Sequence, residues 1–362
     1  MPGPILGYSS AMDADDSLEA LHGVYQRWPK IDLHRHLPGA IPFDTWWRIV
    51  REKGVTLPSD DPAELRRRMS ISGKHDLKTF LKCFDLVDLV YVDAETIEQL
   101  TYEVIADAAR DGLIYLELRY SPTRMAASAG ISTAAALEAT IAGRDRALAG
   151  HDITVELIAG LSREMGVERC TAEAKVIAGY AGRGIAGIDL LGNEIDYPAS
   201  WYAPIFRPLA EEGILGITIH AGESSSAQSV ADAILELGAT RIGHGVRAEE
   251  DPAVLALVRE RGVTLEMCPT SNVQTQATAD YDTHPLPRYH RDGIRVTINS
   301  DDPSISQIDL AHEYATATAL MGMSPAEVQA TLYTAVEAAF TAEETKERLR
   351  AHLDQFFATE TA

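Results

Sequence analysis

The feature that most constrains the fold is a regular alternation of short β-rich runs with longer, alanine-rich helical segments. The β-rich runs span residues 30–36, 113–120, 153–160, 185–192, 215–223, 240–246, 262–269 and 295–303. Strands that alternate with helices pair in parallel through right-handed crossovers. Eight such units in about 300 residues predict an α/β fold, a closed (β/α)8 TIM barrel. A doubly wound open sheet is the alternative that this pattern leaves open.

Two regions depart from the alternation. About 75 residues separate the first two predicted strands, and we expect helices there near residues 43–53, 76–90 and 94–111. A helical insertion after the first strand lies on the catalytic side of a barrel, where it is a candidate lid. Residues 1–28 are expected to form a loose tail and a short helix around 18–28. No internal repeat or linker divides the rest, so residues 29–362 are predicted to form one catalytic barrel domain.

Composition limits the partners of this chain. It has 362 residues, 46% of them hydrophobic, and a formal net charge of −22. Such an acidic surface repels phosphate backbones and anionic lipids, so we expect no nucleic-acid or membrane partner. The first residues carry no signal-peptide pattern, and no run approaches the roughly 20 apolar residues of a membrane span. The three cysteines are widely separated, which favours a reducing compartment. We therefore expect a cytoplasmic protein; its oligomeric state stays open.

The first predicted strand ends in Asp-Leu-His-Arg-His, which places His34 and His36 on the same face. Two imidazoles at a strand end supply half of a metal site, since catalytic zinc takes three or more nitrogen or oxygen ligands. Alone, this pattern is also compatible with two histidines at a barrel rim without a metal.

Three other predicted strands end in ionisable residues. The fifth ends in His-Ala-Gly-Glu, the sixth in Gly-His-Gly and the eighth in Ser-Asp-Asp-Pro. The carboxyl ends of all strands of a (β/α)8 barrel face one mouth, where active sites lie. The residues brought together there are His34, His36, His220, Glu223, His244, Asp301 and Asp302. Such a cluster indicates a hydrolytic metal site.

These motifs, in this order and spacing, resemble those of the adenosine deaminase family. Gly187–Glu194 resembles the family's fourth-strand signature, and Cys268–Thr275 resembles its seventh-strand loop. The matches run from about Pro29 to Pro303, which is most of the chain. The resemblance implies a zinc-dependent deaminase that acts on a small purine.

The resemblance also implies roles for individual residues. The zinc ligands would be His34, His36, His220 and Asp301. Glu223 would shuttle a proton to the purine, and His244 would orient the attacking water by accepting a hydrogen bond from it. Asp302 and the backbone N–H of Gly192 would hold the purine. Related barrels with two metals carry a bridging lysine on the fourth strand; residues 186–194 contain none, which favours one zinc ion per chain.

Zinc, histidine and carboxyl groups suit this reaction, because the C6 amino group of a purine is a poor leaving group on a poor electrophile. Zinc lowers the pKa of bound water from about 15.7 towards 7, and a buried, protonated Glu223 would donate to ring N1. The prediction is hydrolytic deamination of an adenosine-like nucleoside. The alternatives are adenine deamination, amide or lactone hydrolysis, and an inactive barrel that binds purines or metal.

Some residues have two interpretations. An apolar stripe at helical spacing is formed by Leu77, Phe80, Leu81 and Phe84. It is either core packing or, as the resemblance implies, a hydrophobic gate over the purine. Ser121 either contacts the substrate or belongs to a turn before proline. The polar surroundings of His75, His284 and His290 predict solvated side chains.

Pro38 is the clearest departure from the family pattern. Many members have an acidic residue at this position, and it meets the ribose 5′-hydroxyl. Proline offers neither an acceptor side chain nor an N–H. We therefore expect the 5′ end of the substrate to be handled differently, as in 6-aminodeoxyfutalosine, 5′-thioadenosines or free adenine.

Overall fold

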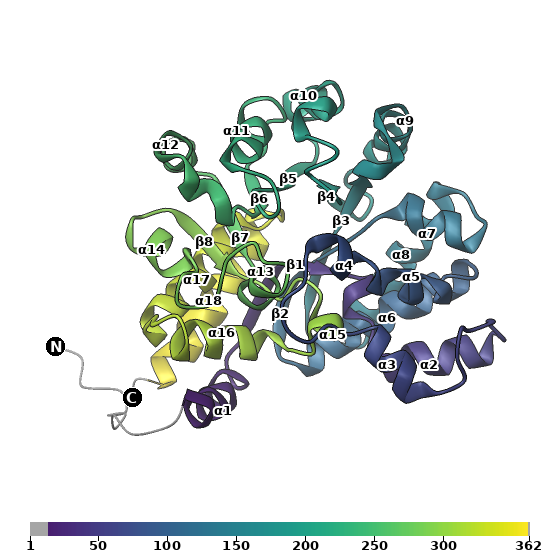
Figure 1. Cartoon of the computed structure of the whole chain (residues 1–362), viewed down its shortest axis with the longest axis horizontal. Helices are drawn as coiled ribbons and strands as arrows, with labels where there is room; N and C mark the ends of the chain where they lie inside the picture. The colour runs from purple at the N-terminus through teal and green to yellow at the C-terminus, as the bar shows by residue number, and fades with distance from the viewer. Residues whose placement is uncertain (1–13, 361–362) are drawn as a thin grey trace.

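The computed structural model describes residues 14–360 and is built on eight parallel strands in sequential order (Figure 1). The strands are β1 (Lys30–His36), β2 (Leu113–Tyr120), β3 (Thr154–Ser162), β4 (Ile185–Leu191), β5 (Gly216–Ala221), β6 (Arg241–His244), β7 (Thr264–Met267) and β8 (Arg295–Ile298). Each strand pairs with the next one in the chain. The predicted (β/α)8 barrel is confirmed, and the sequential strand order excludes the doubly wound sheet.

The barrel closes through the residues that follow β8. Arg35 and Asp301 form a parallel bridge. The Asp301 N–H donates to the His34 carbonyl and the His36 N–H donates to the Asp301 carbonyl, each at 2.8 Å. The Leu33 N–H donates to the Asn299 side chain at 3.0 Å. Backbone groups of β1 thus find partners where β8 itself has ended.

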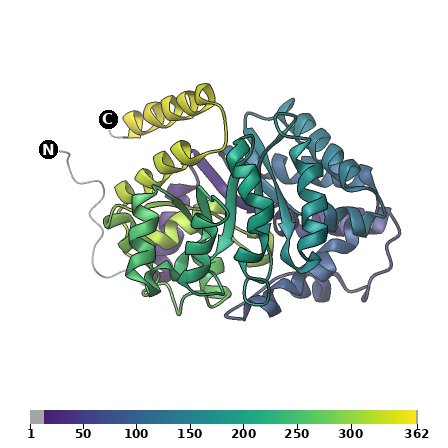
Figure 2. The same ribbon diagram turned by 90° about the horizontal axis from the view of Figure 1, so that it is seen from above.

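The long helices between strands cover the outside of the barrel (Figures 1 and 2). They are α6 (Ala94–Arg110), α8 (Thr133–Leu148), α9 (Val167–Ala178), α10 (Ala203–Glu212), α11 (Ala227–Leu235), α12 (Pro252–Glu260) and α14 (Leu286–Arg291). After β8 come α16 (Leu310–Ala319), α17 (Pro325–Ala338) and α18 (Glu343–Glu360). Helix α17 packs against β8 and β1, which covers the closing seam.

Short helices follow several strands at the mouth of the barrel. They are α7 (Pro122–Ala129) after β2, α13 (Pro269–Gln274) after β7 and α15 (Pro303–Ser306) after β8. Each has proline in its first turn, where the missing N–H costs nothing because helix N-termini leave those donors unpaired. Single-turn 3-10 helices lie at Pro38–Ala40, Asp88–Val90, Arg163–Met165, Ala199–Tyr202 and Val246–Glu250.

The insertion after β1 contains more helices than we predicted. It comprises α2 (Phe43–Glu52), α3 (Pro62–Arg68), α4 (Leu77–Leu81), α5 (Cys83–Val87) and α6. The expected helix at 76–90 is broken at Lys82, whose N–H bonds to Thr79 at a tighter, three-residue spacing. The missed helix α3 begins with the Asp61 side chain capping the Ala63 N–H. Asp-Pro at a helix start is the sequence signal that could have revealed it.

The N-terminal helix α1 spans Ala14–Tyr25, earlier in the chain than the predicted 18–28. It packs against α16. Trp28 lies in the following turn. Its ring centroid is 4.7 Å from that of Tyr25 and 4.8 Å from that of Phe357. Most of the expected tail, residues 1–13, lies outside the described residues.

Within residues 14–360, no single helix is long and apolar enough to cross a membrane; the bent pair α7 and α8 passes only by length and composition.

Glu173 on α9 gives a test of the packing outside the barrel. Its side chain is buried, and one carboxyl oxygen accepts the Thr123 N–H of α7 at 3.2 Å. The other oxygen has no hydrogen-bond partner among the described residues. Burial raises the pKa of Glu173 to about 7. The folded state therefore keeps a proton that the unfolded chain loses near pH 4.3, so this residue lowers stability progressively between roughly pH 4.5 and 7.

We predict that Glu173→Gln stabilises the protein above pH 7 by up to about 3 kcal/mol and has little effect at pH 4.5. Thermal unfolding of both proteins between pH 4.5 and 8 measures the difference. The exposed Glu168 of the same helix provides the control, because Glu168→Gln should show no such trend. A stability difference for Glu173→Gln that does not change with pH would contradict the assignment.

Candidate metal centre and active-site pocket

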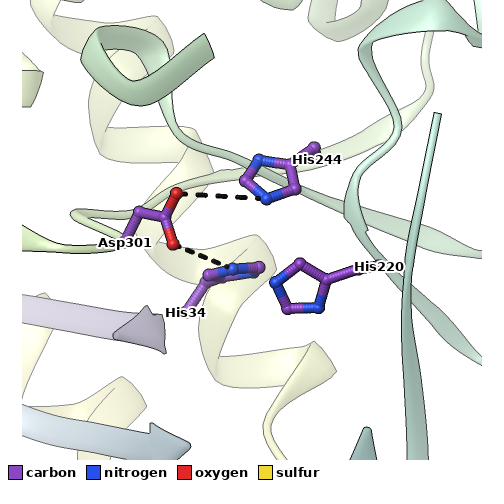
Figure 3. Close-up of side chains that lie close together, drawn as sticks. All are labelled: His34, His220, His244 and Asp301. Atoms are coloured by element: carbon purple, nitrogen blue, oxygen red, sulfur yellow. Dashed lines mark ion pairs between the residues drawn. The ribbon is translucent and has the colours of Figure 1, made fainter. Parts of the chain in front are cut away.

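Four ionisable side chains from separate strand ends converge at the carboxyl-terminal mouth of the barrel. Figure 3 shows the rings of His34, His220 and His244 gathered around the carboxylate of Asp301. The His34 ring centroid lies 4.6 Å from that of His220 and 4.8 Å from that of His244. His36 joins the group, with its ring 5.2 Å from both His34 and His220. The strand ends therefore deliver all the predicted metal ligands to one place.

The separations between ligand atoms fit one small cation. Oδ1 of Asp301 lies 3.4 Å from Nε2 of His34 and 3.2 Å from Nε2 of His36. Nε2 of His220 lies 3.3 Å from Nε2 of His36. A tetrahedral zinc ion with bonds of about 2.0–2.1 Å holds its ligands about 3.3 Å apart. These three separations therefore match those between the ligands of a zinc ion.

Two of the histidines are oriented by buried carboxylates. Nδ1 of His34 lies 2.8 Å from Oε2 of Glu266, and Nδ1 of His220 lies 3.0 Å from Oδ2 of Asp189. An ionised carboxylate only accepts, so each neutral ring donates from Nδ1 and carries a lone pair on Nε2. Among the described residues, Nε2 of His34 has no hydrogen-bond partner. The Nε2 lone pair of His34 faces the Asp301 carboxylate. A cation between the two would offset their repulsion.

The electrostatic surroundings of the histidines also favour a bound cation. Burial and Arg119 lower the pKa of His34, but the carboxylates of Asp301 and Glu266 outweigh them and raise it. Burial lowers the pKa of His36 to about 4, against the opposing effect of Asp301. The site stabilises positive charge without protonating every ring, which suits a divalent cation.

Two overlapping sets of residues meet the spacing for a metal. One is His34, His220, His244 and Asp301, and the other is His36, Asp301 and Asp302. His244 lies farther out than His36, because its Nε2 is 4.0 Å from Oδ2 of Asp301 and 3.7 Å from Oε2 of Glu223. Distance therefore favours His36 as the third imidazole, with His244 facing the space beside Glu223.

A single arginine holds the two orienting carboxylates. Arg119 of β2 pairs with Asp189 through Nη1 and with Glu266 through Nη2, each at 2.7 Å. All three side chains are fully buried. Burial opposes ionisation, but Arg119 and the neighbouring cationic groups lower the pKa of both acids. Sequence reasoning missed this triad; a charged residue inside an otherwise apolar strand is the signal that marks each member.

Glu194 positions the loop that carries Glu223. Its buried carboxylate accepts the N–H groups of Gly222 at 3.0 Å, Glu223 at 2.8 Å and Ser225 at 2.7 Å, and the hydroxyl of Ser229 at 2.8 Å. Sequence analysis quoted Glu194 within a motif but gave it no role. Burial, with Asp301 and Glu194 nearby, raises the pKa of Glu223 well above its usual value. This shift favours the neutral, protonated form of the Glu223 carboxyl.

A pocket opens beside these residues. Its lining includes the predicted site residues His36, Leu77, Phe80, Leu81, Phe84, Ser121, Gly192, His220, Glu223, His244, Asp301 and Asp302. His34 lies beneath it, fully buried.

Both interpretations of the apolar stripe are compatible with its position. Phe80 and Phe84 pack with Ile71, Cys83 and Ile305 in a small separate core. The same two rings face the pocket. The Ser121 hydroxyl caps α7 by accepting the Arg124 N–H at 3.4 Å, and it also accepts from Ser162 at 3.0 Å.

Asp302 lines the pocket, and one of its carboxyl oxygens, Oδ1, is buried without a partner among the described residues. Burial, together with Asp301 and Glu223, raises the pKa of Asp302. Its position requires glycine at Gly39, because a Cβ there would lie 1.7 Å from Oδ1. A glycine is likewise needed at Gly243, where a Cβ would lie 2.9 Å from the His34 ring.

His244 and Asp301 both have left-handed backbone conformations, with φ of 63° and 58°. Non-glycine residues rarely adopt this conformation, which costs about 1–2 kcal/mol. This backbone strain thus occurs at the two residues whose side chains turn into the barrel mouth.

One sequence prediction in this region is wrong. His284 is buried, only 4% exposed, and not solvated. His75 and His290 are half-buried. The polar residues around His284 gave no sign that its ring packs under α13.

The chain was compared with known families and structures. A family model described as adenosine deaminase matches residues 29–356. The adenosine deaminase of Shewanella denitrificans is 37% identical over 324 residues, which cover 89% of this chain and 97% of that protein. That of Erwinia tasmaniensis is 38% identical over 326 residues, covering 90% and 98%.

Two solved structures have the same fold over most of the chain. The adenine deaminase from Arthrobacter aurescens aligns with a TM-score of 0.83 at 25% identity, covering 91% of this chain and 99% of that one. The Arabidopsis N6-mAMP deaminase aligns with a TM-score of 0.80 at 29% identity, covering 92% and 99%.

The ligand set is tested by comparing His36→Ala with His244→Ala. Loss of a direct ligand should weaken metal binding by more than about 100-fold, so His36→Ala should be purified nearly metal-free. His244→Ala should keep the metal content of the native protein. Elemental analysis of the dialysed proteins measures both. Metal retained by the His36 variant and lost from the His244 variant would reverse the assignment.

Proposed function

Since this chain belongs to the adenosine deaminase family and is a hydrolytic deaminase acting on a C–N bond, we propose that it removes the C6 amino group of an adenosine-like nucleoside with the help of one zinc ion. The observation that carries this proposal is the position of Glu223. Its carboxyl lines the same pocket as His36, His220 and Asp301. A proton donor, a candidate metal site and a pocket thus meet at one point.

The proposed ligands are His34, His36, His220 and Asp301. When bound there, zinc would act as a Lewis acid that lowers the pKa of water to near neutrality. The carboxylates of Glu266 and Asp189 keep His34 and His220 oriented with Nε2 towards the metal. The protein's part at this centre is to fix the ligands before substrate arrives.

Glu223 would donate its proton to N1 of the purine. This withdraws electrons from C6, so that the oxygen of water forms a bond to C6. The C6–N bond then breaks, and the amino group leaves as ammonia after gaining a proton. The overall change is water added and ammonia released, with no oxidation. Its buried surroundings keep Glu223 protonated for the first step.

Asp302 and Gly192 would hold the base. Asp302 lines the pocket, where its carboxyl would bond to a purine nitrogen. Gly192, which follows β4, also lines the cavity, and Leu77, Leu81 and Phe84 supply apolar surface. The apolar side chains of α4 and α5 would exclude water from the purine.

The proposed 5′ specificity rests on Pro38. It lines the pocket but has no hydrogen-bonding group for a hydroxyl. Asp88 and Arg124 also line the pocket, paired with each other at 2.5 Å. No described residue accepts a hydrogen bond from the two Nη atoms of Arg124, so they are available to a polar or anionic 5′ substituent. This arrangement favours a nucleoside with an altered 5′ group.

Replacing Glu223 tests the proton shuttle. Glu223→Gln keeps the shape but cannot deliver a proton, so kcat should fall by about 10³-fold or more while metal content stays unchanged. The absorbance change from an adenine to a hypoxanthine ring measures turnover and separates deamination from amide or lactone cleavage. Unaltered turnover would exclude Glu223 as the donor. Absence of turnover in the native protein with every adenine-containing substrate would favour the inactive barrel.

The 5′ proposal is tested with adenosine, 5′-deoxyadenosine, 6-aminodeoxyfutalosine and adenine. Because Pro38 offers no partner for the 5′-hydroxyl, kcat/KM for adenosine and 5′-deoxyadenosine should agree within about threefold; a site that binds the hydroxyl rejects the deoxy analogue by about 10³-fold or more. Ammonia release measures both. Pro38→Asp should create a preference for adenosine. A strong preference for adenosine in the native protein would refute the proposal.

A further inference from the structure

His244 lies at the end of a buried chain of three side chains. Its Nδ1 is 2.9 Å from Nδ2 of Asn272, and Oδ1 of Asn272 is 3.1 Å from Nε2 of His284. Asn272 belongs to α13, and His284 precedes α14. All three residues are less than 5% exposed.

Backbone N–H groups fix the direction of every hydrogen bond in this chain. The Leu286 N–H donates to Nδ1 of His284 at 3.2 Å. Because a backbone N–H can only donate, Nδ1 of His284 accepts. Burial lowers the pKa of His284 to about 3, so the ring is neutral and carries its proton on Nε2. His284 therefore donates to the oxygen of Asn272.

A second backbone group sets the orientation of the amide. The Cys268 N–H also donates to Oδ1 of Asn272, at 3.3 Å. Two donors thus converge on the amide oxygen, which leaves the amide nitrogen facing His244. This settles the oxygen and nitrogen positions of Asn272 by hydrogen bonding.

The amide in turn selects the tautomer of His244. Nδ2 of Asn272 only donates, so Nδ1 of His244 accepts, and the neutral ring carries its proton on Nε2. That N–H faces the space between Glu223 and Asp301, 3.7 Å and 4.0 Å from their nearest carboxyl oxygens. His34 and His220 have the opposite arrangement, because their Nδ1 atoms face carboxylates.

We infer that Asn272 and His284 are positioning residues that hold His244 as the Nε2–H tautomer, which makes it a hydrogen-bond donor in the active site and excludes it from the metal's ligands. The sequence-based expectation was the reverse, with His244 accepting from water. A fixed donor beside Glu223 stabilises negative charge that develops on the oxygen joining C6. Only this catalytic consequence rests on the proposed function; the tautomer does not.

The tautomer is measured directly in the native, metal-loaded protein. With ¹⁵N-labelled histidine, long-range ¹H–¹⁵N correlation spectra distinguish a protonated from an unprotonated ring nitrogen. The resonances of His244 among the 11 histidines are those lost in His244→Gln. We expect an unprotonated Nδ1 and a protonated Nε2. A proton on Nδ1 of His244 overturns the inference, whatever substrate the enzyme uses.

Asn272→Asp reverses the direction of the hydrogen bond to His244 and preserves those from His284 and Cys268. The carboxylate still accepts from His284 and Cys268, but it now also accepts from Nδ1 of His244. We expect Nδ1 of His244 to gain a proton in the spectrum, and kcat to fall by about 100-fold with KM changed less than about threefold. An unchanged kcat, or an Nδ1 still unprotonated, overturns the inference.

Ser271 provides the matched control on the same helix. It is fully buried beside Asn272, and its hydroxyl has no hydrogen-bond partner within the described part of the chain. Ser271→Ala should leave the His244 resonances, kcat and KM unchanged. An equal loss of kcat in this variant would mean that any disturbance of α13 impairs the enzyme, which overturns the specific role of Asn272.

Discussion

The site depends on one buried cation, the guanidinium of Arg119, which lies between the carboxylates of Asp189 and Glu266. Each carboxylate also accepts the Nδ1–H of a histidine, His220 or His34. Removing one member of such a buried ionic group costs about 3–5 kcal/mol, because the remaining charges are left unpaired. Arg119 therefore makes it possible to hold two carboxylates in the barrel interior, and those carboxylates aim the imidazoles that converge on Asp301.

Closure of the barrel and assembly of the site are the same event. The backbone of Asp301 bonds to His34 and His36, and its side chain faces the Nε2 atoms of both rings. A barrel that failed to close would lack both the seam and the metal centre. For His34, His220 and His244, the partner on Nδ1 then decides what the ring does. A carboxylate makes the ring a candidate ligand, whereas the amide of Asn272 makes His244 a hydrogen-bond donor.

The strands were predictable because short β-rich runs alternate with helical segments, and the first two strands match their predicted bounds. Strands β6 to β8 are shorter than predicted; β6 ends at His244, where the backbone turns to the left-handed conformation. The candidate metal ligands and catalytic residues could be recognised in the sequence at strand ends, but the residues that position them could not. Arg119, Glu194 and His284 act through neighbours that are distant in sequence. Their hydrogen-bond and ion-pair partners in the protein interior are known only once the chain is folded.

The central claim is that three histidines and one aspartate from β1, β5 and the β8 extension share a single zinc ion. X-ray absorption at the zinc edge of the purified protein tests it most directly. The account predicts one zinc per chain, a shell of nitrogen and oxygen at about 2.0–2.1 Å, and the outer-shell scattering of three imidazoles. A sulfur neighbour at about 2.3 Å, a second metal at about 3.5–4 Å, or no bound zinc at all would contradict it.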